Sequence, residues 1–376
     1  MSLVRGTGEA GTSGARKSSA SDPVSWEVAG RVARQALRFA PVLDDATSAK
    51  LDEDFAEATE RAEALVSELT GLSSADGPAR AKVVDRVGWV DANIGSFRRL
   101  LAPVGERLAT SSGALQQALS PGSKAAAGVE VGLMLAWISS RVLGQYDLLP
   151  MDAEDAGDVV YYVGPNIVNL ERRHGFPPSE FRLWIALHEV THRLQFTGVP
   201  WMRDYFLGLV ERGTSMVTPD GRAVLDSLLH AVSEIRAGRN PLEEGGVIGL
   251  LATSEQLATL REAQALMSLL EGHGDIVMSR AGREFVPGAQ RFAEVLAQRR
   301  ASAKGLSKVI QQAIGIEAKL RQYAEGERFV EEVIETGGDE LLSRAWAAPE
   351  FLPNIEEIRD PKRWVHRVEG MASPVA

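Results

Sequence analysis

Two histidines and a glutamate occur at a spacing that could hold a metal ion. His188, Glu189 and His192 form the pattern H-E-x-x-H, in a chain with only 6 histidines among 376 residues. In a helix, residues four apart lie on one face, so both imidazoles can reach a single zinc ion. Glu189 then lies near a water beside the ion and can act as its general base. The spacing predicts a zinc site with His188 and His192 as ligands and Glu189 as the catalytic residue.

Catalytic zinc commonly has three protein ligands, so another is expected elsewhere in the chain. The segment containing Glu271, His273 and Asp275 follows helical spacing and offers suitable side chains. Glu271 and Asp275 are four apart and share a face, whereas His273 lies about 200° around an ideal helix from Glu271. In a regular helix Glu271 and His273 are therefore not expected to bind the same ion, and each remains a candidate for the third ligand.

The composition limits the other functions open to the chain. It has no cysteine, so any metal must be held by His, Asp or Glu, and disulfides and cysteine nucleophiles are excluded. The formal net charge is -10, and no long run of Lys or Arg forms a basic patch. This charge disfavours nucleic acid as a partner.

The elements around the H-E-x-x-H pattern can be predicted from local composition. Two prolines followed by apolar residues at helical spacing predict a helix over residues 177–194. Just upstream, β-branched and aromatic residues predict a strand over 158–163, the only strand that the pattern indicates. Residues 25–145 read as all-helical, and helical spacing dominates again beyond Trp201. We therefore expect a mainly α fold with a small β-sheet.

The periodicity breaks at 144–157, where Gly, Pro and acidic residues interrupt it. We expect a disordered tail at 1–21, an N-terminal helical region at 22–150 and a catalytic region at 151–376. The last two could form one compact unit.

The first 21 residues lack the apolar core of a secretory signal. The most apolar stretch, Ala125–Ile138, is interrupted by Glu130 and is shorter than the ~20 residues that a membrane span needs. We therefore expect a buried helix at Ala125–Ile138, no membrane span and a cytoplasmic location.

The combination of H-E-x-x-H with a later E-x-x-x-D resembles the pattern of the gluzincin branch of the zincins. That resemblance implies that Glu271 is the third zinc ligand and that Asp275 orients one of the histidines. The stretch between His192 and Glu271 is far longer than in thermolysin-like enzymes, so His273 is the reserve ligand. In zincins a strand edge beside the active helix aligns the peptide substrate, which points to residues 158–163.

A closer resemblance covers most of the chain. It is to a bacterial family of zincin-like hydrolases and implies a zincin-like metalloprotease architecture. Members of that family are often labelled as associated with deazaflavin coenzyme biosynthesis, but these residues contain no deazaflavin-binding signature, and no role in coenzyme synthesis is expected. The similar segments are residues 84–93, 142–147, 164–167, 188–196, 270–275 and 319–323.

These patterns predict a zinc-dependent metallopeptidase that acts on a peptide or protein substrate. A zinc hydrolase of small amides and a non-catalytic zincin-like scaffold with a structural metal remain alternatives. Glu189 favours catalysis, because a purely structural site has no use for a general base between its ligands. Hydrolysis also needs a donor for the developing oxyanion. Tyr323 is one candidate, although a tyrosine at helical spacing is more often part of the core.

Overall fold

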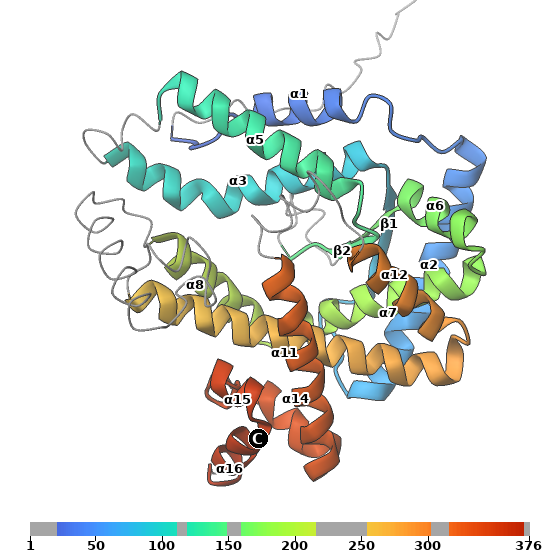
Figure 1. Cartoon of the computed structure of the whole chain (residues 1–376), viewed down its shortest axis with the longest axis vertical. Coiled ribbons are helices and arrows are strands. Elements are labelled where there is room, and N and C mark those ends of the chain that lie inside the picture. The colour runs from blue at the N-terminus through green and yellow to red at the C-terminus, as the bar shows by residue number, and fades with distance from the viewer. Residues whose placement is uncertain (1–20, 111–118, 149–158, 216–253, 302–315, 372–376) are drawn as a thin grey trace, which may run out of the picture.

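A computed structural model of the chain describes residues 21–110, 119–148, 159–215, 254–301 and 316–371. Within these ranges the protein is mostly helical with one small sheet (Figure 1), which confirms the predicted fold class. The predicted tail at 1–21 lies outside the described residues apart from Ser21. The helices are α1 (Trp26–Ala36), α2 (Asp45–Thr70), α3 (Arg86–Thr110), α5 (Pro121–Ser139), α6 (Gly164–His174), α7 (Pro178–Thr197), α8 (Met202–Ser215), α11 (Ser254–Phe285), α12 (Ala289–Ala301), α14 (Ile316–Ser343), α15 (Ile355–Arg359) and α16 (Pro361–Glu369), with the 3-10 turns η1 (Arg344–Trp346) and η2 (Pro349–Phe351).

The sheet contains β1 (Arg80–Val84), β2 (Gly144–Tyr146) and β3 (Val159–Val163), in the order β1-β3-β2. β1 pairs in parallel with one side of β3, and β2 pairs antiparallel with the other side. The prediction that residues 25–145 are all helical is wrong, because this stretch contains β1 and most of β2. The prediction that residues 158–163 present a strand edge is also wrong. β3 is the central strand, and β2 is the edge strand nearest α7 in the described part of the sheet.

One face of β3 is buried and the other is partly buried. Val160 and Tyr162 face the main core, where Tyr162 stacks on Phe55 of α2 with ring centroids 4.0 Å apart. Val163 faces a smaller core formed with α1, α3 and α5, because successive strand residues point to opposite faces. In Figure 1 these three helices form the upper layer. The sheet therefore lies between this layer and the helices of the main core, which include α2 and α7.

The helix that carries H-E-x-x-H begins where the two prolines predict. Pro177 has extended backbone, and Pro178 occupies the first turn of α7, where a backbone N–H would have no helical partner. The preceding helix α6 ends at Gly175, whose φ of 60° is the left-handed conformation that glycine adopts without strain. The chain thus turns sharply between α6 and α7.

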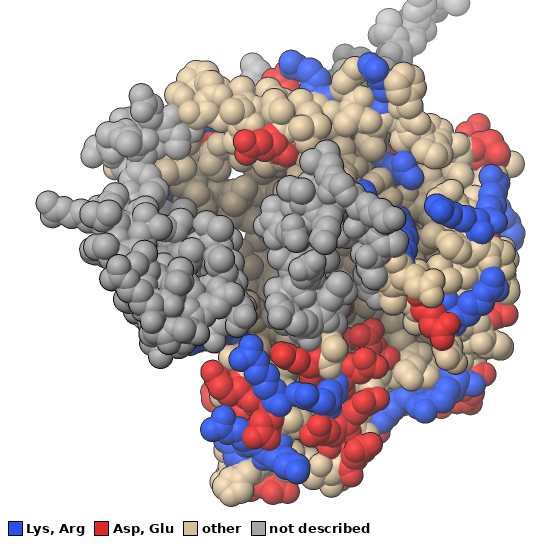
Figure 2. Space-filling view, viewed as in Figure 1, with Lys and Arg blue, Asp and Glu red and all other residues tan. Residues whose placement is uncertain are grey.

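The long helix α11 packs against two cores at once. Leu266 and Leu270 belong to the main core that includes α7, whereas Ala265 and Leu269 belong to a second core with α14, α15 and α16. These C-terminal helices form the lower end of the molecule in Figure 1, and Figure 2 shows acidic and basic side chains interspersed over that end. Packing on two sides fixes the rotation of α11 about its own axis, which decides where its polar side chains point.

The apolar helix α5 lies directly beside α1. A Cβ on Gly128 or Gly132 would lie 2.6 or 2.5 Å from a backbone oxygen of the α1 segment, so the close approach requires glycine. The prediction of a buried helix at Ala125–Ile138 is wrong in part, because Val129 and Leu133 are 40% and 52% exposed. Among the described helices, none is long and apolar enough to cross a membrane.

Candidate metal centre

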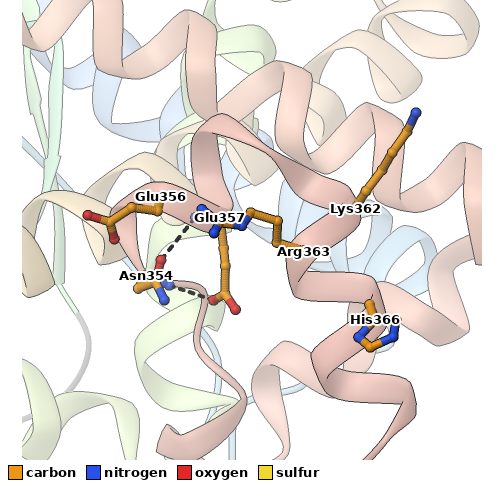
Figure 3. A pocket seen from close by; sticks show the side chains of 6 residues that line it. All are labelled: Asn354, Glu356, Glu357, Lys362, Arg363 and His366. Carbon is orange, nitrogen blue, oxygen red and sulfur yellow. Dashed lines mark hydrogen bonds between the residues drawn. The ribbon is translucent and has the colours of Figure 1, made fainter.

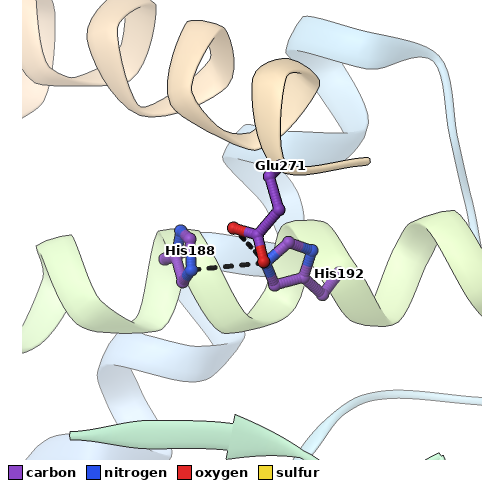
Figure 4. A group of neighbouring side chains, drawn as sticks. All are labelled: His188, His192 and Glu271. Atoms are coloured by element: carbon purple, nitrogen blue, oxygen red, sulfur yellow. Dashed lines mark hydrogen bonds and ion pairs between the residues drawn. The ribbon is translucent and has the colours of Figure 1, made fainter. Parts of the chain in front are cut away.

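Three side chains from two helices meet in the structure. His188 and His192 project from α7, and Glu271 projects toward them from α11 (Figure 4). One donor atom from each lies within 4.8 Å of the other two, and the described residues contain no other such group of potential metal ligands. The fold thus brings the predicted trio together although Glu271 is remote in sequence from both histidines.

The spacing of these donors suits a tetrahedral zinc ion. Nε2 of His192 lies 3.2 Å from Nε2 of His188 and 3.8 Å from Oε2 of Glu271. Zinc–nitrogen distances of about 2.0–2.1 Å at a tetrahedral angle place two ligand nitrogens roughly 3.3 Å apart. The side chains of His192 and Glu271 each remain 16% exposed, which leaves the cluster open to water. Two histidines, a carboxylate and an accessible fourth position form a donor set that catalytic zinc uses.

Two arginines of α7 tie that helix to its neighbours. The side chain of Arg193 is fully buried and donates to Oε1 of Glu63 in α2 at 2.7 Å. Near the other end of α7, Arg182 donates to Glu171 of α6 at 2.8 Å and also pairs with Asp54 of α2. Loss of one partner from a buried pair leaves a charge without compensation, so these pairs oppose sliding or rotation of α7. The two histidines therefore stand on a helix that is anchored on both sides of them.

Glycines set the position of α11 at the level of Glu271. A Cβ on Gly272 would lie 2.2 Å from the carbonyl carbon of Gly326 in α14, so the two helices approach this closely only where both lack side chains. A Cβ on Gly274 would lie 3.7 Å from Cε1 of His192. The backbone of α11 is thus close to α14 on one side and close to the histidine rings on the other.

Glu189 is buried close to the donor cluster and beneath β2. It is 8% exposed, and a Cβ on Gly144 of β2 would lie 2.5 Å from its Cγ. Burial and the nearby carboxylate of Glu271 raise the pKa of Glu189 to about 8, although a hydrogen bond from the Tyr146 backbone N–H opposes this rise. A cation held by the donors would also lower this pKa. Without a cation, the environment of Glu189 therefore favours its protonated form more than water does.

His273, the reserve ligand, does not join the donor cluster. It is 4% exposed, its Nδ1 lies 3.0 Å from Nε2 of Gln195, and its ring packs edge-on against Trp346. Burial lowers the pKa of His273 to about 4, and the neighbouring His192 adds to this effect. His273 is thus a neutral side chain that is hydrogen-bonded to Gln195 and lies outside the donor cluster.

Sequence reasoning missed two residues that contact the histidines. Gln195 is fully buried, and its Oε1 lies 3.0 Å from Nδ1 of His192. Sδ of Met278 lies 3.2 Å from Nδ1 of His188. The second ring nitrogen of a ligand histidine usually has a polar partner. The signal that could have found Gln195 is therefore an amide that follows a candidate ligand on the same helix, at a position where the pattern predicts burial. No sequence signal distinguishes Met278 from an ordinary core residue.

Two further predicted residues stay predictions. Asp275 follows Glu271 by one turn of α11 and is half-buried. Tyr323 lies within α14, but its side chain is outside the described part of the structure.

A separate depression lies between α15 and α16 (Figure 3). Asn354 and Glu357 form a reciprocal capping box at the start of α15, and Glu357 also pairs with Arg367 at 2.6 Å. These polar side chains already have hydrogen-bond or ion-pair partners within the protein, so we assign no chemistry to the depression. Its lining residues are Asn354, Glu356, Glu357, Lys362, Arg363 and His366.

Comparison with known proteins identifies a family for the chain. The model of a family described as zincin-like metallopeptidase matches residues 24–365. A crystal structure from Chloroflexus aurantiacus, described as a candidate hydrolase with a novel fold, is 32% identical and has a TM-score of 0.69. The match covers 93% of this chain and 100% of that one. No curated protein matches. The family match extends over both helices that carry the donor cluster.

Proposed function

The chain belongs to the zincin-like metallopeptidase family, and from this premise we propose that it is a zinc-dependent hydrolase of peptide or amide bonds. One observation carries the proposal. His188, His192 and Glu271 converge from α7 and α11, with Glu189 buried close to them. The donors supply a place for the metal, and Glu189 supplies a base between the two histidines.

We assign the metal to His188 and His192 through their Nε2 atoms and to Glu271 through its carboxylate. A zinc ion bound there would supply the Lewis acid, acidifying the attacking water and polarising the scissile carbonyl. Asp275 is one turn from Glu271, and the intervening Gly274 would place a Cβ 4.0 Å from Nδ1 of His188. Asp275 thus lies on the part of α11 that faces the histidines, which is consistent with a role in orienting one of them.

Glu189 moves the protons. Its carboxylate accepts a proton from the water as the oxygen attacks the carbonyl carbon, and then delivers it to the leaving amine nitrogen as the C–N bond breaks. The Tyr146 backbone N–H holds the carboxylate by a hydrogen bond. The contact with Gly144 limits how far Glu189 can swing away, so the base is held in position before substrate binds.

The substrate strand is proposed to lie along β2. In the described sheet, one side of β2 pairs with β3, and Gly144 and Tyr146 of β2 lie against Glu189. A peptide in extended conformation could add to the outer side of β2 through main-chain hydrogen bonds, which would bring its scissile bond close to the base. This geometry favours a peptide over a small amide, because a small amide gains little from a strand edge.

The alternative is a scaffold in which a metal only joins α7 to α11. Glu189 argues against it, because burying a carboxylate next to Glu271 costs stability and a structural site needs no base there. We therefore favour catalysis and keep the scaffold as an outcome of the test.

The test is elemental analysis combined with a peptide-library cleavage assay. Wild type should bind about one zinc per chain and cleave peptides, and Glu189→Gln should keep the zinc but lose roughly 100- to 10,000-fold in turnover. Glu68→Gln, at an exposed site on α2, is the matched control and should behave as wild type. Stoichiometric zinc without any Glu189-dependent cleavage would favour the scaffold. Failure to bind zinc after loading would exclude both metal models.

A further inference from the structure

Gln195 connects the two helices that carry the proposed ligands. It is fully buried on α7, and its side-chain amide makes three hydrogen bonds. Its Oε1 lies 3.0 Å from Nδ1 of His192, and its Nε2 lies 2.8 Å from the carbonyl oxygen of Leu270 and 3.0 Å from Nδ1 of His273. Leu270 directly precedes Glu271, so one amide touches a histidine of the cluster and the backbone next to the carboxylate.

The chemistry of these partners fixes the orientation of the amide. A backbone carbonyl only accepts hydrogen bonds, so the NH₂ group of Gln195 must face Leu270. The amide oxygen then faces His192. The opposite orientation would place the amide oxygen against the carbonyl oxygen of Leu270, where neither atom can donate.

The orientation of the amide in turn fixes the proton on His192. An amide oxygen only accepts, so Nδ1 of His192 must carry the hydrogen and donate it. In the neutral ring, Nε2 then keeps its lone pair, and Nε2 is the atom that lies 3.2 Å from Nε2 of His188. The nitrogen that faces the cluster is therefore the one that is free to bind a metal.

His273 receives the remaining hydrogen of the amide. Its Nδ1 accepts from Gln195, so its own hydrogen lies on Nε2. Its ring is held by Trp346 at a centroid distance of 5.2 Å. His273 thus accepts a hydrogen bond that helps to hold the amide of Gln195 in place, although His273 itself lies outside the donor cluster.

We propose that Gln195 is the positioning residue of the metal centre: it holds His192 in the Nδ1–H tautomer and joins α7 to α11 beside Glu271. The inference rests on the proposed function, because it concerns metal binding by the same donors. The residue that orients His192 would thus lie on the same helix as His192, three residues further along the chain.

The test measures zinc affinity by competition with a chelator, at a temperature where circular dichroism shows each metal-free protein to be folded. Gln195→Leu introduces an apolar, slightly shorter side chain and removes all three hydrogen bonds. Its zinc affinity should fall 10- to 100-fold, as is typical when the polar partner of a ligand histidine is lost. The d–d absorption of the Co²⁺-loaded protein should also change, because His192 is released to other orientations.

Two further variants separate positioning from a general loss of packing. Gln195→Glu in its neutral form offers one donor and one acceptor, so it should recover most of the affinity, and it carries the test if Gln195→Leu does not fold. Thr197→Val removes a side-chain hydrogen bond to Arg193 O on the same helix, and its affinity should match wild type.

The outcomes distinguish this inference from the function on which it rests. Wild-type zinc affinity and an unchanged Co²⁺ spectrum in Gln195→Leu would overturn the positioning role and leave the metal site intact. Equal losses of affinity in Gln195→Leu, Gln195→Glu and Thr197→Val would overturn it too, because they would reflect packing of α7 alone. Absence of zinc from wild type would refute the proposed function itself.

Discussion

Gly144 of β2 lies so close to Glu189 of α7 that a Cβ on residue 144 would be 2.5 Å from Cγ and 2.7 Å from Oε1 of the glutamate. The φ of Gly144 is not in the left-handed region, so its backbone could accommodate alanine. The three heavy atoms nearest to such a Cβ all belong to Glu189. This contact links the edge of the sheet directly to the proposed base.

We expect Gly144→Ala to displace Glu189 and to lower kcat by about 10-fold or more, since displacement of a catalytic group by about 1 Å can cost far more than this. Zinc content should stay at the wild-type level, because the atoms nearest to a Cβ on residue 144 belong to Glu189 and not to a proposed ligand. Gly122→Ala is the control, as a Cβ there meets nothing within 4 Å. Normal turnover in Gly144→Ala would show that the base does not depend on this contact.

The raised pKa of Glu189 predicts how the stability of the metal-free protein depends on pH. The pKa rises from 4.5 to about 8 on folding, so between these values the folded state binds more protons than the unfolded state. The free energy of unfolding should therefore fall as pH rises from about 5 to 8, by at most about 1.4 kcal/mol per pH unit from this group. Chelator-treated Glu189→Gln should lack this contribution, and urea unfolding across the range measures the difference. Parallel pH profiles for the two proteins would contradict the burial argument.

Glu271 and His273 should differ sharply as partners of the metal. Glu271→Gln replaces a proposed ligand and should weaken zinc binding by about 100-fold or more, beyond the loss expected for an indirect partner. His273→Asn removes a side chain whose Nδ1 bonds to Gln195 and should cost less. Isothermal titration with zinc compares the two. A larger loss in His273→Asn would reverse the assignment of the third ligand.

The close approach of α11 and α14 predicts a cost for any side chain at Gly326. A Cβ there would lie 2.0 Å from the carbonyl oxygen of Ser268, which is backbone and cannot move aside easily. Gly326→Ala should lower the free energy of unfolding by roughly 1–3 kcal/mol, as overpacking does. Gly213→Ala in α8 meets nothing within 4 Å and should be neutral or stabilising, because alanine favours helix. Denaturant unfolding of the chelator-treated proteins checks both, and equal stabilities would argue against the steric contact.

The sequence predicts the local parts of this protein well. His188 and His192 share a helix face because the period of the helix alone places residues four apart together. β3 is predictable because five consecutive β-branched and aromatic residues fit a pleated, buried surface. These predictions needed no knowledge of what packs against them.

The parts that the sequence did not predict depend on partners distant in the chain. β1 and β2 have weak strand patterns of their own and exist because they pair with β3. The central place of β3 follows from those partners, so the composition of residues 158–163 alone does not show that another strand forms the sheet edge. The local signal for Gln195, an amide after a ligand histidine, gives no indication of its second partner, the carbonyl of Leu270 on another helix. The resemblance to the gluzincins supplied Glu271, which spacing alone left open against His273.

The division of the donors between α7 and α11 has a consequence for engineering. Because α11 rests on α14 through Gly272 and Gly326, a substitution in the C-terminal helices can alter the separation of Glu271 from the histidines without touching the site. The metal affinity of such a variant would then report how closely the C-terminal helices pack against α11. A colorimetric zinc-release assay could rank C-terminal variants by docking, with no substrate required.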